Sequence, residues 1–126
     1  MITEKLIDLY RLRRYPILQD ICKLEERPVV YTVGARDGLP STRLQFLHRH
    51  KAIIGVGFEP DPEEAARLAQ SGVLDHVSPT ALGNESKTAT LYLTKMRGAS
   101  SLYRPDLVAL KKLSKIGGEF EVEREV

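Results

Sequence analysis

Two adjoining stretches decide the fold class of this 126-residue chain: PVVYTV at residues 28–33 and GARDG at residues 34–38. The first is rich in β-branched and aromatic residues, which favour an extended backbone. The second begins and ends with glycine, which can adopt backbone conformations that other residues avoid. A short apolar run that stops at a glycine is typical of a buried strand in a parallel sheet.

The residues that follow alternate between helical and extended patterns. Apolar residues recur at helical spacing over residues 41–50, and residues 52–58 form a second apolar run. A helix is predicted over residues 61–72, with an aspartate at its N-cap, a proline in its first turn and a glycine at its end. Residues 73–77 can form a third strand. The alternation predicts a doubly wound α/β sheet.

The segment before the first strand has the pattern of amphipathic helices. Apolar residues recur at spacings of three and four over residues 2–24, with Thr3 in position to cap the first turn. Pro16 should break this stretch into two short helices, because proline lacks a backbone amide. We therefore expect an N-terminal helical segment over residues 1–27 and a sheet domain over residues 28–126.

The pattern changes in the last third of the chain. Residues 88–94 alternate like a strand, and residues 98–101 form a loop. A helical turn is expected over residues 105–113, and residues 119–126 alternate like a further strand.

Composition excludes several classes of protein. Nineteen Lys and Arg against 17 Asp and Glu leave a net charge of +2, too small to predict a nucleic-acid partner. No apolar run approaches the roughly 20 residues that span a bilayer, so no membrane partner is expected. The three histidines lack the spacing of a metal site, so no metal is expected. The single cysteine, Cys22, fits a reducing compartment, and we expect it to be a buried small hydrophobe in a cytoplasmic protein.

The residues that can carry chemistry lie at the ends of the first two predicted strands. Gly34 and Gly38 allow the backbone to approach a ligand closely. The next helix should direct its free amides at the same place. Glu59 ends the second strand, where a carboxylate can accept hydrogen bonds from both hydroxyls of a ribose. The loop lacks both the dinucleotide-binding glycine pattern and the Gly-Lys-Ser/Thr end of a P-loop. The alternative is a plain sheet with a glycine turn and a capping acid.

Three motifs resemble the N-terminal half of FkbM-type methyltransferases, which use S-adenosylmethionine. They are VYTVGARDG at residues 30–38, GFEPDP at 57–62 and TALG at 80–83. Residues 88–93 and GASSLY at 98–103 resemble the segment that follows in that family. The resemblance implies a partial Rossmann-like class I methyltransferase sheet with S-adenosylmethionine as its cofactor. It also implies methyl transfer to a hydroxyl oxygen of a small-molecule or sugar acceptor.

The resemblance also implies roles for individual residues. The loop residues Gly34, Ala35, Arg36, Asp37 and Gly38 would line the methionine and ribose parts of the cofactor. Glu59 would hold the ribose hydroxyls, and Pro60 would shape the turn after it. Ala81 and Leu82 would lie near the adenine. Ser100 and Ser101 would border the acceptor pocket. No residue is assigned a catalytic role.

The chain departs from the family pattern in two respects. Thr32 stands where the family usually carries an acid that positions the cationic part of the cofactor, so binding should be weaker. The chain also ends before the further core strand and the rest of the sheet that the family carries. The strand over residues 29–33 is therefore expected to form an exposed apolar edge. Exposed edges favour pairing, so self-association through this edge is expected.

Two other functions remain open at this stage. The first is a non-catalytic interaction module that keeps the methyltransferase-like fold. The second is a fragment of another nucleotide-binding protein, such as a dehydrogenase, which the spacing of the glycine loop disfavours.

Overall fold

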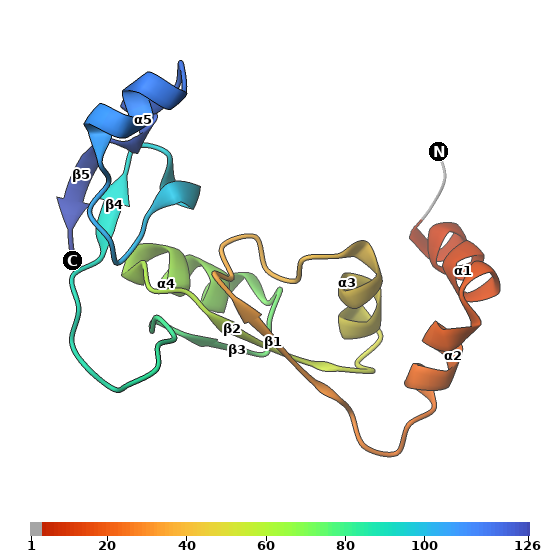
Figure 1. The fold of residues 1–126 in the computed structure, drawn as a ribbon. Coiled ribbons are helices and arrows are strands. Elements are labelled where there is room, and N and C mark those ends of the chain that lie inside the picture. The colour runs from red at the N-terminus through yellow and green to blue at the C-terminus, as the bar shows by residue number, and fades with distance from the viewer. Residues whose placement is uncertain (1–3) are drawn as a thin grey trace. The chain divides into compact units, whose positions relative to one another are not determined.

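The computed structural model describes residues 4–126 and divides the chain into two compact units (Figure 1). The first unit is Met1–Ala81 and the second is Leu82–Val126. The predicted cap Thr3 lies outside the described residues. Each unit has its own sheet, and each is described by itself.

The first unit contains a three-stranded parallel sheet. Its strands are β1 (Val29–Val33), β2 (Ile54–Phe58) and β3 (His76–Ser78), in the order β1-β2-β3. The register pairs Val33 with Phe58 and Phe58 with Ser78, so the three strands end at the same level. The predicted α/β class with a partial Rossmann-like sheet is thus confirmed. The third strand was predicted over residues 73–77, but it begins three residues later and ends one residue later.

Both crossover helices cover the same face of this sheet. Helix α3 (Thr42–Arg49) connects β1 to β2, and α4 (Pro62–Ser71) connects β2 to β3. Crossovers between parallel strands are right-handed, so two crossovers that advance in one direction place their helices on one side. The buried residues of the resulting core are Leu18, Ala35, Leu39, Phe46, Leu47, Ala52, Ile53, Leu68 and Leu74.

The two crossover helices begin where the sequence predicted. The Ser41 hydroxyl accepts a hydrogen bond from the Leu44 amide and caps α3. Asp61 caps α4 in the same way, and Gly72 ends α4 in the left-handed conformation.

The other face of the sheet is apolar and largely open. On β1, Tyr31 and Val33 are each 65% exposed, and the Tyr31 ring stacks on Phe58 of β2. Strand β1 is also an edge of the sheet, as the sequence analysis expected. The expectation of a fully buried strand is wrong for β1, because no described helix of the first unit covers this second face.

Two helices precede the sheet: α1 (Glu4–Arg14) and α2 (Pro16–Cys22). The break at Pro16 is confirmed, and Leu18 of α2 is buried in the core of the first unit. Cys22 is exposed, which corrects the expectation that it is buried. Cys22 is the last residue of α2.

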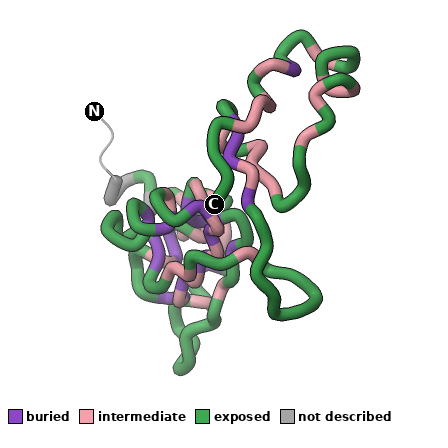
Figure 2. Tube along the Cα trace, turned by 90° about the vertical axis from the view of Figure 1, so that its left-hand side faces the viewer, coloured by how far each residue is buried: buried purple, intermediate pink, exposed green. Residues whose placement is uncertain are grey.

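The second unit is built on an antiparallel pair of strands. Its elements are β4 (Tyr92–Thr94), the 3-10 turn η1 (Arg97–Ala99), α5 (Leu107–Leu113), the 3-10 turn η2 (Gly117–Phe120) and β5 (Val122–Glu125). The strands predicted over residues 88–94 and 119–126 are shorter than their sequence patterns suggested. The segment before β4, residues 82–90, is exposed along its whole length (Figure 2). Within the part of the chain that the structure describes, no helix is long and apolar enough to cross a membrane.

Candidate functional site

The ends of the first two strands of the first unit are held together by backbone hydrogen bonds. The Gly34 and Ala35 amides both donate to the Phe58 carbonyl, at 2.9 and 3.1 Å. The Glu59 amide donates to the Ser78 carbonyl at 3.0 Å, which ties in the end of β3. The start of the glycine loop and the predicted acid thus lie side by side at the carboxyl edge of the sheet, the usual ligand-binding edge of open α/β sheets.

Glu59 is a buried carboxylate at this edge, with 7% of its surface exposed. Its Oε1 accepts a hydrogen bond from the Asp61 amide at 3.0 Å. Asp61 in turn accepts from the Glu63 amide at 3.1 Å and caps α4, so the turn around Pro60 is fixed by the helix that follows. No described residue donates a hydrogen bond to the second oxygen of Glu59. This oxygen can accept a hydroxyl from a ligand.

Gly34 gives the edge its open space. Its φ is +67°, a left-handed conformation that a side chain rarely adopts, and no atom lies within 4 Å of the place where a Cβ would stand. Gly34 is exposed, and the hydrogen bond from its amide to the Phe58 carbonyl places it beside Phe58, the residue before Glu59. A ligand held by Glu59 can therefore approach the Gly34 backbone without a steric barrier.

The loop after Gly34 runs back along the covered face of the sheet before α3 begins. Ala35 lies against Gly57, where an added Cβ would stand 2.8 Å from the Ala35 Cβ, and Leu39 lies near Gly55. In Figure 1, α3 lies toward the amino-terminal ends of β1 and β2. The expectation that α3 directs its free amides at the carboxyl edge is therefore wrong, since the loop carries the helix start away from it.

Thr32 does not face open solvent. It is 9% exposed, and its hydroxyl is directed at the Gly38 carbonyl across a long 3.5 Å hydrogen bond. The side chain therefore tethers the loop, and it carries no charge that could position a cationic ligand.

Arg36 and Asp37 are the middle residues of the loop. The Arg67 guanidinium of α4 donates to the Arg36 carbonyl at 2.9 Å and pairs with Glu64. The hydrogen bond that Arg67 donates to the Glu64 carboxylate is the main reason that the pKa of Glu64 is lowered. The loop backbone is thus fastened to α4 from the outside, and Asp37 is exposed.

The remaining predicted residues fall at or beyond the boundary between the units. Ala81 is the last residue of the first unit, and Leu82 is the first residue of the second. Ser100 accepts a hydrogen bond from the Thr94 amide in the second unit, at 3.1 Å. Ser101 likewise accepts from the Tyr103 amide at 3.1 Å. Both serine hydroxyls therefore stabilise turns of the second unit.

Two hydroxyls at the end of β3 were given no role by the sequence analysis, although Thr80 begins the TALG motif. The Ser78 and Thr80 oxygens lie 2.5 Å apart, at the same edge as Glu59. Their position directly after a predicted strand was the available signal. Among the described residues there is no group of three or more His, Cys, Asp or Glu that could hold a metal ion.

No protein-family model matches the chain, and a search of curated proteins and of solved structures also gives no match.

Proposed function

We propose that the first unit binds S-adenosylmethionine at the carboxyl edge of its sheet, as part of a methyltransferase of the FkbM type. The observation that carries this proposal is the position of the buried Glu59, which has one oxygen without a hydrogen-bond donor among the described residues, beside the unobstructed Gly34. The cofactor supplies a methyl group bound to a positively charged sulfur, ready for transfer to a hydroxyl of a small-molecule or sugar acceptor.

The residues at this edge fit the cofactor in part. Glu59 is held in place by the Asp61 amide and can accept the ribose hydroxyls through its second oxygen. Gly34 leaves room for the methionine part, with Ala35 packed behind it. The hydroxyls of Ser78 and Thr80 extend the polar edge beyond Glu59.

A cytoplasmic location and self-association belong to the same proposal. The single cysteine fits a reducing compartment. The exposed β1 edge carries Tyr31 and Val33, and its unpaired backbone groups can form hydrogen bonds with a second copy of the chain.

The second candidate is an interaction module without catalysis. Two observations favour this candidate. The amides of Gly34 and Ala35 already donate hydrogen bonds to the Phe58 carbonyl, and the first turn of α3 lies away from the carboxyl edge. An anionic group at this edge would find few free donors. The two candidates differ in whether the chain binds the cofactor.

Calorimetric titration with S-adenosylhomocysteine tests the proposal. We expect saturable binding by the parent chain and none with NAD. The isosteric variant Glu59→Gln keeps the acceptor for the Asp61 amide but loses the charge, and should bind about tenfold or more weakly. The matched control Glu25→Gln, at an exposed acid before β1, should bind like the parent. A folded parent chain that gives no heat, or equal affinity in Glu59→Gln, would contradict cofactor binding and leave the interaction module.

A further inference from the structure

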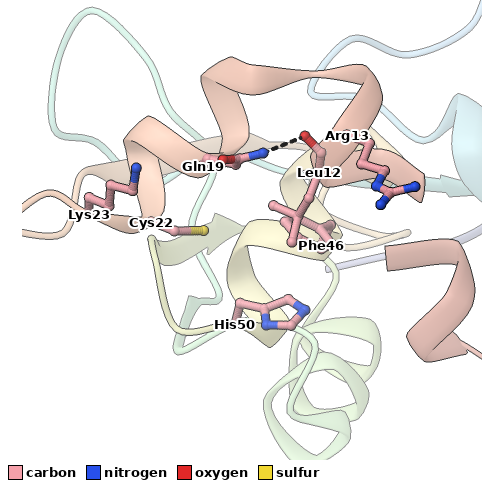
Figure 3. A pocket seen from close by; sticks show the side chains of 7 residues that line it. All are labelled: Leu12, Arg13, Gln19, Cys22, Lys23, Phe46 and His50. Atoms are coloured by element: carbon pink, nitrogen blue, oxygen red, sulfur yellow. Dashed lines mark hydrogen bonds between the residues drawn. The ribbon is translucent and has the colours of Figure 1, made fainter. Parts of the chain in front are cut away.

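We propose that a pocket between α1, α2 and α3 binds a small carboxylate with an apolar tail. The pocket has a volume of about 490 Å³, within the range of ligand sites. Its main lining residues are Leu12 and Arg13 of α1, Cys22 of α2, Lys23 directly after α2, Phe46 of α3 and His50 directly after it (Figure 3).

Contacts between the three helices hold the pocket walls together. The Gln19 side-chain amide donates to the Leu12 carbonyl at 2.9 Å and joins α2 to the last turn of α1. Leu18, on α2, is buried in the core with Phe46 of α3. The Phe46 and His50 rings are in contact, with their centroids 4.4 Å apart. The pocket is thus bounded by packed elements and not by a single loop.

The floor of the pocket is apolar. Leu12 is half-buried against the core, and Phe46 is fully buried behind it. In Figure 3 these two side chains meet at the centre of the pocket, with the Cys22 sulfur directed toward them. An apolar tail seated on Leu12 would be removed from water, which supplies the nonpolar part of the binding free energy.

The rim of the pocket is cationic. Arg13 and Lys23 are exposed and lie on opposite sides of it in Figure 3, and no carboxylate is among the lining residues. Within the described part of the chain, neither Arg13 nor Lys23 has an ion pair. An anionic head group complements this rim, and a carboxylate can accept two parallel hydrogen bonds from an arginine.

This pocket is distinct from the proposed cofactor edge. It is lined by α1, α2 and the end of α3, whereas Glu59 and Gly34 lie at the carboxyl ends of the strands. Carboxylate binding in this pocket is therefore independent of cofactor binding at the carboxyl edge, and each can be tested without the other.

Cys22 provides a direct readout, because it is the only cysteine of the chain and it lines the pocket. The experiment measures the rate at which iodoacetamide alkylates Cys22 in the full chain, with increasing octanoate as the probe. A bound tail should shield the thiol, so alkylation should slow saturably, about tenfold when octanoate is present at about ten times its Kd. Octylammonium, with the same tail and the opposite charge, should protect far less.

Two variants and one control complete the test. Arg13→Gln and Lys23→Gln should each raise the Kd of octanoate by about two- to fivefold, the effect of an exposed ion pair. Lys112→Gln, at an exposed lysine of α5, should leave it unchanged. Circular dichroism checks that all three variants are folded. Unslowed alkylation at saturating octanoate, equal protection by octylammonium, or an unchanged Kd in the Arg13 and Lys23 variants would overturn the proposal.

Discussion

The close approach of the loop to β2 predicts that Gly57→Ala is destabilising. A Cβ at Gly57 would stand 2.6 Å from Leu74 Cδ1 and 2.8 Å from the Ala35 Cβ. The end of the Leu74 side chain can move. Ala35, however, is fully buried, and its amide donates a hydrogen bond to the Phe58 carbonyl that holds it in place. The methyl group can be accommodated only by a shift of the loop backbone.

The expected size of the effect follows from two opposing contributions. Replacing glycine by alanine within a strand gains about 0.5–1 kcal/mol from reduced chain entropy. Overpacking of a tight core costs about 1–3 kcal/mol. The central values leave a loss of about 1 kcal/mol in the free energy of unfolding. At a urea dependence of about 2 kcal/mol per molar, the unfolding midpoint should fall by about 0.5 M.

The assay is urea unfolding followed by far-ultraviolet circular dichroism, with Gly55→Ala as the matched variant. A Cβ at Gly55 meets only the flexible Leu74 tip closely, at 3.0 Å, and then His48 at 3.5 Å. We therefore expect Gly57→Ala to be the less stable of the two. If Gly57→Ala is as stable as the parent, or more stable than Gly55→Ala, the loop does not pack against β2 as closely as described.

Three further predictions concern the first unit. Asp61→Ala should lose about 1 kcal/mol of stability in urea unfolding, because the Glu63 amide loses its capping acceptor. The Asp75 carboxylate accepts a hydrogen bond from the Gly55 amide at 2.7 Å, which lowers the pKa of Asp75 in the folded state. Its stabilising contribution is therefore complete above its unfolded pKa of about 3.9 and is lost as the pH falls through the lower folded value. Asp75→Asn should flatten the acid side of a plot of the urea midpoint against pH. Val33→Lys, at the exposed β1 edge, should reduce self-association in sedimentation velocity.

Each of these predictions has its own control. Asp61→Asn keeps a capping acceptor and should retain most of the stability that alanine loses. If the urea midpoint falls as steeply with decreasing pH in Asp75→Asn as in the parent, another group dominates the acid dependence of stability. Val108→Lys places the same charge on the exposed α5 of the second unit and should leave the sedimentation behaviour unchanged. A parent chain that sediments as a monomer at every concentration would contradict pairing through β1.

Local sequence signals located most elements of the first unit. The apolar runs became β1 and β2, the helical spacing over residues 41–50 became α3, and the predicted cap Asp61 became the start of α4. Glu59 was correctly placed at the end of β2, because it directly follows the apolar run that forms this strand. These features depend on residues close together in the chain, so the sequence contains enough information to predict them.

The second unit was harder to read because its strands are short and its hydrogen bonds connect distant residues. Thr94 pairs with Val122, and the Lys95 ammonium bonds the Glu121 carboxylate at 2.6 Å. The alternating pattern over residues 119–126 includes Phe120, which lies in the 3-10 turn η2. Alternation over a few residues does not distinguish a turn from a strand.

The sequence by itself determined the α/β class, the helix starts and the presence of a carboxylate at the end of β2, since these follow from local propensity and capping. Only the tertiary structure decided where the glycine loop goes, because its path depends on the space that Gly57 leaves for Ala35. It also decided that Cys22 is exposed beside a cationic pocket, since this depends on how α2 meets α3. Contacts between segments distant in the chain fix these features, and no local pattern encodes them.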